Sequence, residues 1–138
     1  MHINYVAILL ATVAQFIVGA IWYTPLFGRL WGKIHGFDKL PKATQKKMMS
    51  MMPAMLGIQF VTTILTSFVL YLFIAYQPSW NAYAMAGFLW LGFVVPTQVS
   101  AVIFGNTEPK WVITKIAIMA GASILCLEAA AIVLRMML

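Results

Sequence analysis

Apolar residues fall into four long runs that polar segments separate. The runs cover residues 5–27, 54–76, 82–104 and 111–136. A helix needs about 20 residues to cross the hydrocarbon core of a bilayer, and each run is long enough. The pattern therefore predicts an all-α fold, an integral membrane bundle of four antiparallel transmembrane helices. These spans leave no room for a separate soluble domain.

The whole chain, residues 1–138, is expected to form this single transmembrane domain. Its longest polar connection, residues 28–53, holds six of the nine basic residues. Within it, residues 41–52 place lysines toward one helical face and methionines toward the other, which predicts a short amphipathic helix on the cytoplasmic surface of the membrane. The lysines of this helix are Lys42, Lys46 and Lys47. Each lysine near an anionic leaflet contributes about 1 kcal/mol to membrane binding, so we expect anionic lipids of the inner leaflet as a partner.

Charge placement predicts the orientation of the spans. Four spans put residues 28–53 and 105–110 on the same side of the membrane, and these connections with the adjacent Lys115 carry every basic residue except Arg135. Because cytoplasmic loops are enriched in lysine and arginine, both connections are expected in the cytoplasm and both termini on the opposite side.

Composition excludes several functional classes. The chain is 63% hydrophobic and 9% charged, whereas soluble domains are about 45–50% apolar and about 25% charged, so a soluble enzyme or a disordered linker is excluded. The net charge of +6 does not indicate nucleic-acid binding, because the basic residues adjoin the spans and no binding module fits in the remaining length. No phosphate-binding loop, HExxH, CxxC or GxSxG motif occurs, so we expect no enzymatic activity and no cofactor.

Methionines are concentrated before the second span. Five of them lie within eight residues, at Met48, Met49, Met51, Met52 and Met55. Thioethers are soft ligands that suit Cu(I), but methionine is also an adaptable apolar side chain for helix surfaces. We interpret the group as apolar packing and expect no metal site, with metal binding as the alternative.

Polar residues inside the spans are the candidate functional positions. Each span has one polar or small-residue face, and four such faces can meet inside a bundle. The candidate polar or proton site consists of Gln15, Gln59 and Gln98 from the first three spans and Glu128 and Arg135 from the fourth. Such faces are typical of ordinary packing between membrane helices, and a hydrated path or substrate cavity is the alternative.

Glu128 is the acidic residue within a span. An ionised carboxylate at this depth costs roughly 2.5–3.5 kcal/mol on insertion scales, and protonation would remove much of that cost. We prefer a structural role, as an ion pair with Arg135 or a hydrogen bond to Gln15 or Gln59. The alternative is a proton-coupling site.

Two segments resemble a known family. One is the element W-Y-x-P-L-F-G-x-x-W from Trp22 to Trp31, and the other is residues 87–96, which include Trp90 and Pro96. Together they resemble the small bacterial membrane proteins of domain of unknown function 1761, in which serine is more frequent at the position of Thr24. The resemblance implies a four-span protein of the bacterial cytoplasmic (inner) membrane, and it implies no activity. In such a membrane, the orientation expected from the basic residues puts both termini in the periplasm.

The first segment is interpreted as an interfacial anchor. Pro25 ends or bends the first span, Trp22, Tyr23 and Trp31 lie at headgroup level, and Gly28 allows the chain to turn. A recognition site for a lipid headgroup or a partner is the alternative.

These observations lead to one functional expectation and one rival. We expect a non-enzymatic protein that acts by association, as a homo-oligomer or as an accessory subunit with other membrane proteins. The rival is a proton-linked small transporter or channel that uses Glu128.

Overall fold

The computed structural model describes residues 2–138, which form helices and turns with no strand among them. The first span is α1 (Tyr5–Ile21) with a π-helical turn, η1 (Trp22–Leu26). A short helix, α2 (Gly28–Ile34), and a 3₁₀ turn, η2 (Phe37–Lys39), lead to α3 (Lys42–Tyr76). The third span consists of α4 (Ala82–Leu89), the π-helical turn η3 (Trp90–Val94) and α5 (Val95–Ile103). A 3₁₀ turn, η4 (Pro109–Trp111), precedes α6 (Val112–Met137).

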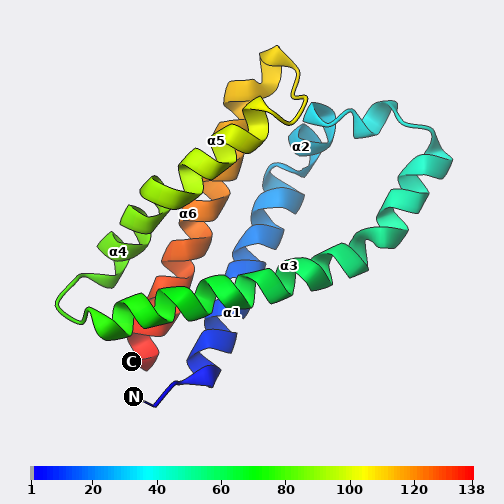
Figure 1. Cartoon of the computed structure of the whole chain (residues 1–138). Helices are drawn as coiled ribbons and strands as arrows, with labels where there is room; N and C mark the ends of the chain where they lie inside the picture. Colours follow the sequence, from blue (N-terminus) through cyan, green and yellow to red (C-terminus); the bar gives the residue numbers. More distant parts are fainter. Residues whose placement is uncertain (1) are drawn as a thin grey trace.

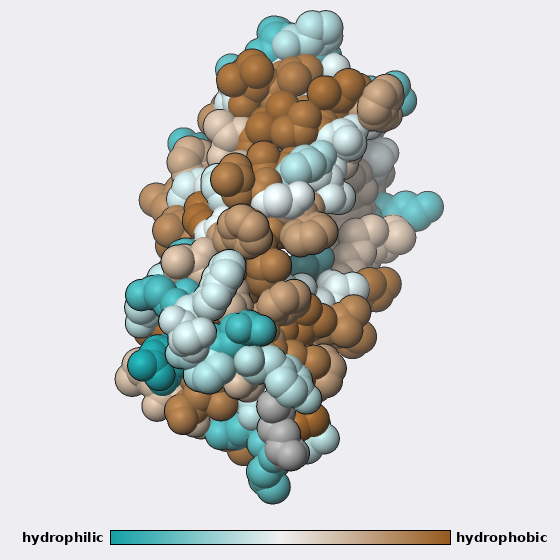
Figure 2. All heavy atoms as spheres, turned by 60° about the vertical axis from the view of Figure 1, so that its left-hand side comes forward, coloured by the Kyte–Doolittle hydropathy of each residue, from teal (hydrophilic) through white to brown (hydrophobic). Residues whose placement is uncertain are grey.

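The structure confirms four helices long and apolar enough to cross a membrane. They are Tyr5–Leu26, Lys42–Tyr76, Ala82–Ile103 and Pro109–Met137. Figure 2 shows hydrophobic residues dominating the middle of one face, with hydrophilic residues at its upper tip and in its lower part. By length and composition, the chain therefore has the helices of a multi-pass membrane protein.

Helix α6 is at the centre of the fold. It packs against α1 on one side and against α4 and α5 on the other, while α3 crosses this group at a wide angle (Figure 1). Both termini lie at the end where α3 crosses, which we call the terminal end. We call the opposite end, where residues 28–41 and 105–111 come together, the basic end.

Asparagine side chains start two of the spans. Asn4 Oδ1 accepts a hydrogen bond from the backbone N–H of Ala7 at 3.0 Å, and Asn81 Oδ1 accepts from Tyr83 and Ala84 at 2.9 and 3.1 Å. An N-cap of this kind satisfies backbone donors that have no partner inside the helix. These two spans therefore begin where their apolar runs begin.

The hydrophobic core lies in the half of the molecule next to the terminal end. Ala7 and Ala11 of α1 and Ala130 and Ala131 of α6 are completely buried, and such small residues let two membrane helices approach closely. The end of α3 adds buried larger side chains, among them Tyr71. This small-residue contact fixes α1 against α6.

Helix α3 is continuous where the sequence predicted a boundary. We expected a connector that ends at residue 53 and a span that begins at 54, but a single helix of 35 residues includes Pro53. Proline lacks an N–H, so its effect here is a bend, visible in Figure 1, and not an end of the helix. At 1.5 Å per residue α3 is about 52 Å long, which exceeds the ~30 Å hydrocarbon core.

Candidate functional site: polar contacts between the spans

A buried polar group joins α1 to α3. Thr12, Gln15 and Ser67 are less than a tenth exposed. Thr12 Oγ1 lies 2.9 Å from Ser67 Oγ, and Gln15 Nε2 donates to the same serine oxygen over 2.8 Å. Since the lipid interior offers no competing water, these contacts satisfy polar atoms that would otherwise be costly to bury. They hold α3 onto α1 at one level of the bundle.

Trp22 inserts between helices. Its indole N–H donates to the backbone carbonyl of Ile118 in α6 at 3.0 Å. Gly121 makes room for the ring, because a Cβ there would lie 2.7 Å from Trp22 Cζ2. Trp22, expected at headgroup level, thus makes a specific contact with α6.

Trp90 makes the equivalent contact from the other side of α6. Its indole N–H lies 3.0 Å from both the carbonyl oxygen of Ala120 and Ser123 Oγ. Gln98 continues this group, since its Nε2 donates to the carbonyl of Met119 and its Oε1 accepts from Ser123, each at 3.3 Å. Gln98, a predicted site residue, therefore contacts α6.

Each of these tryptophans begins a π-helical turn. The carbonyl of Trp22 accepts from the backbone N–H of Phe27, five residues later, at 2.9 Å, and the carbonyl of Trp90 accepts from Val95 in the same way. Pro25 lies inside the first turn, and Pro96 is the second residue of α5, the helix that follows the second turn. Proline cannot donate the usual bond four residues back, which favours a local change of helix type.

The other residues of the segment from Trp22 to Trp31 form a compact corner between α1 and α2. The Tyr23 and Trp31 rings contact edge to face with centroids 5.0 Å apart. A Cβ at Gly28 would lie 2.9 Å from the carbonyl oxygen of Tyr23, so glycine lets the chain turn closely past η1. Lys115 of α6 lies over the Trp31 ring, 5.7 Å from its centroid. The motif thus joins α1, α2 and α6.

Glu128 lies half-buried against α4. Its Oε1 would be 3.8 Å from a Cβ built on Gly87. Within residues 2–138 no hydrogen bond or ion pair holds this carboxylate: Gln15 bonds to Ser67, Gln59 donates to Thr63 at 3.3 Å, and Arg135 is exposed. The expected partners of Glu128 are therefore not brought to it.

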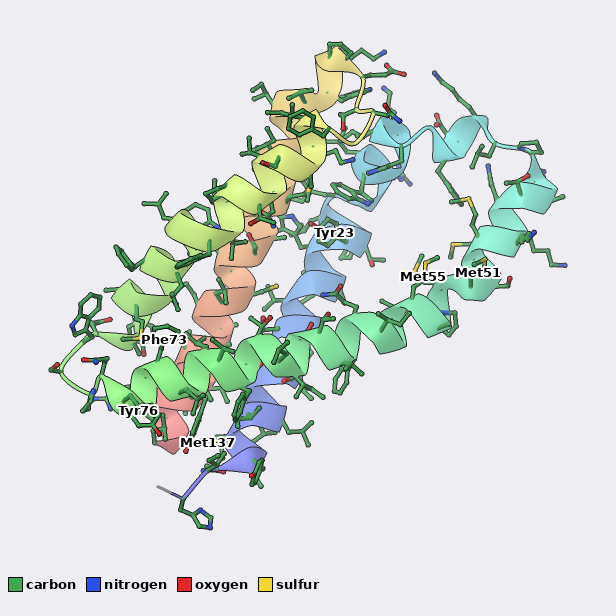
Figure 3. The ribbon with its side chains drawn as sticks, in the orientation of Figure 1. Tyr23, Met51, Met55, Phe73, Tyr76 and Met137 are labelled. Atoms are coloured by element: carbon green, nitrogen blue, oxygen red, sulfur yellow. The ribbon has the colours of Figure 1, made fainter. Side chains whose placement is uncertain are left out.

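The methionine group lies away from the other helices. Figure 3 shows Met51 and Met55 on the part of α3 that stands apart, and all five methionines are exposed. In the described part of the chain, no three histidine, cysteine or acidic residues gather where they could hold a metal.

Sequence reasoning identified Gln15 and Gln98 but missed their partners. Ser67 follows Thr63 by four residues and so extends the polar face of the second span, which was a usable signal. Trp90 was a second signal, because a tryptophan in mid-span has an N–H that needs an acceptor. Nothing in the sequence distinguished Ser123.

Comparison with known proteins identifies one family. Residues 6–135 match the family described as "Protein of unknown function (DUF1761)". No curated protein and no solved structure matches the chain. Since the match covers nearly all of its length, from the first span to the end of the fourth, the chain belongs to the DUF1761 family.

Proposed function

We propose that this protein is non-enzymatic and acts by association in the membrane, assembling with a second copy of itself through the first half of α3. The observation that supports this is the separation of that half from the rest of the chain (Figure 1). At the boundary of this half, Phe60 of α3 contacts Phe16 of α1, with ring centroids 5.1 Å apart. Before residue 60 the large apolar side chains of α3 are exposed, as at Ile58, which is 68% exposed.

Polar atoms on this free half favour a protein partner over lipid. Gln59 is exposed, and its amide makes one side-chain contact, to Thr63 of the same helix. Lipid tails cannot satisfy the remaining amide donor and acceptor, whereas a side chain from another helix can. An amide both donates and accepts, so Gln59 of two copies can pair across a two-fold axis.

The test is the mass of the particle in native lipid nanodiscs. We expect a dimer or larger homo-oligomer, and Gln59→Leu should shift the distribution toward monomer. Thr97→Val is the control, because Thr97 is also exposed in a span and bonds to the carbonyl of Phe93 in its own helix. If the particle instead contains a different membrane protein, the protein is an accessory subunit and not a homo-oligomer. A monomer without any partner would contradict association.

We also propose an orientation for this assembly. The spans run antiparallel in a bacterial inner membrane, with the basic end in the cytoplasm and both termini in the periplasm. Supporting this, the two basic connections line one shared cavity. The first turns of α3 form the amphipathic connector, whose lysines contact anionic lipid: Lys42, Lys46 and Lys47. With its first turns on the membrane surface, only the rest of α3 has to cross the hydrocarbon core, although the whole helix is longer than that core is thick.

A second function, proton-linked transport, is favoured by the unpaired carboxylate of Glu128. A carboxylate without a structural partner inside a span is typical of ion or proton pathways. Glu128→Gln keeps the size of the side chain and removes its titration, so proton flux in liposomes should vanish. Glu108→Gln is the control, since Glu108 lies in an exposed connection. Equal flux in wild type and Glu128→Gln would end this candidate.

A further inference from the structure

The two basic connections line a partly open cavity of about 310 Å³ at the basic end. One wall comes from the end of α2 and from η2, and the other from residues 105–111 and the first turn of α6. The volume is at the lower limit of the ~300–1,000 Å³ typical of small-molecule sites. A single charged ligand group fits such a space.

The cavity wall carries an excess of positive charge. Four ammonium groups face two carboxylates around it: Lys33, Lys39, Lys110 and Lys115 against Asp38 and Glu108. Within residues 2–138 the one ion pair joins Lys110 to Glu108 at 3.4 Å. The other three lysines have no carboxylate within 4.0 Å, so the charge of the site is not neutralised by the protein.

Tryptophan rings fix three of these ammonium groups. Lys33 and Lys110 lie 6.0 and 5.7 Å from the centroid of Trp111, and Lys115 lies over Trp31. A cation–π contact positions an ammonium group while leaving its charge available to an anion. Holding like charges together in this way costs energy, which a bound anion would offset.

Thr107 provides an independent observation. It lines the same cavity, and its hydroxyl oxygen is buried without a hydrogen-bond partner. Buried hydroxyl groups normally have a partner, and leaving one without a partner is unfavourable. Because this oxygen has almost no accessible surface, a ligand oxygen would reach it only after a small shift of the connection that carries Thr107, and would then supply the missing acceptor.

From these observations we propose that the cavity binds a phosphate group. Ammonium and hydroxyl donors together require a ligand rich in acceptor oxygens and negative charge, and lysine is a common phosphate-binding residue. The cavity lies where the apolar spans end, which is the level of phospholipid headgroups. The phosphate therefore comes from an anionic lipid headgroup or from free phosphate.

The test uses the full chain in nanodiscs and measures bound phospholipid by mass spectrometry. In nanodiscs that contain phosphatidylglycerol, Lys33→Gln/Lys115→Gln should reduce retained phosphatidylglycerol by about tenfold, because charge-assisted contacts are lost. Arg29→Gln/Arg135→Gln is the matched control, because it removes the same charge at two exposed positions outside both the cavity and the lysines of α3. Equal losses in the two double variants, or no loss, would exclude a lipid headgroup as the source of the phosphate.

Two further variants separate binding from folding. Thr107→Val removes the unpartnered hydroxyl with little change in volume and should weaken retention about threefold, while Lys33→Arg/Lys115→Arg should retain binding because the charge is kept. Inorganic phosphate, titrated in phosphatidylcholine nanodiscs, distinguishes the sources. Saturable binding that Lys33→Gln/Lys115→Gln abolishes supports free phosphate, and retention of phosphatidylglycerol alone supports a headgroup. Binding of neither probe would contradict the site.

Discussion

Single glycines determine how closely side chains approach the helices of this bundle. Gly121 allows the Trp22 ring to lie on α6 and its N–H to reach the carbonyl of Ile118. Gly28 allows the chain to pass the carbonyl of Tyr23. At both positions an added Cβ would meet a specific atom, so the close contact explains why the residue is glycine.

Gly121→Ala should destabilise the protein. The new Cβ would lie 2.7 Å from Trp22 Cζ2, and overpacking of this kind costs about 1–3 kcal/mol. Thermal unfolding in detergent measures the effect as a lower melting temperature. Gly19→Ala in α1 is the control, because a Cβ there would have no neighbour within 4 Å. Equal melting temperatures for the two variants would contradict the contact between Trp22 and α6.

The sequence predicted individual residues better than their partners. Gln15 was predicted on the polar face of the first span, and it is buried together with Thr12, three residues earlier. Helical periodicity establishes which residues share a face, but not which helix that face meets. Glu128 therefore lies against Gly87 of α4, and within residues 2–138 it makes no hydrogen bond or ion pair with Gln15, Gln59 or Arg135.

At the scale of elements, the starts of α1 and α4 were predictable, whereas the start of α3 and the changes of helix type were not. Apolar run length and the asparagines at positions 4 and 81 define where α1 and α4 begin. Pro25, Pro53 and Pro96 have the same local chemistry, yet one lies in a π turn, one bends a continuous helix and one follows a π turn. The difference comes from tertiary contacts, such as those of Trp22 and Trp90 with α6.

Docking of α3 onto α1 should depend on Ser67. Ser67→Ala leaves Gln15 Nε2 and Thr12 Oγ1 without their shared partner, and interhelical hydrogen bonds in membranes are worth about 0.6–2 kcal/mol. The melting temperature should fall. Ser50→Ala, at an exposed position of the same helix whose hydroxyl bonds to the carbonyl of Lys47, should have no effect. A fall of the same size in both variants would exclude Ser67 as the link.

At the scale of the whole molecule, the number of spans followed from hydropathy, but the course of α3 did not. Its apolar run is what a helix packed side by side with the other three spans would have. In the structure its end packs in the core while its first half stands apart. Hydropathy records that a side chain avoids water and does not tell lipid from another protein chain.

The orientation of the molecule can be tested by labelling in intact cells. In a Cys126→Ser background, which keeps a donor for the carbonyl of Gln15, an impermeant thiol reagent should label Ser79→Cys and not Lys42→Cys. The reason is the concentration of basic residues at the end that carries Lys42. Labelling of Lys42→Cys alone would reverse the orientation.

The central claim, association through the free half of α3, is tested most directly by disulfide cross-linking in membranes. Met55 lies one turn from Gln59, on the same face, and Gly57 lies on the opposite face of the same helix. In the Cys126→Ser background, Met55→Cys should form a covalent dimer under mild oxidation, and Gly57→Cys should stay monomeric. Equal cross-linking at both positions, or none at Met55→Cys, would contradict the account.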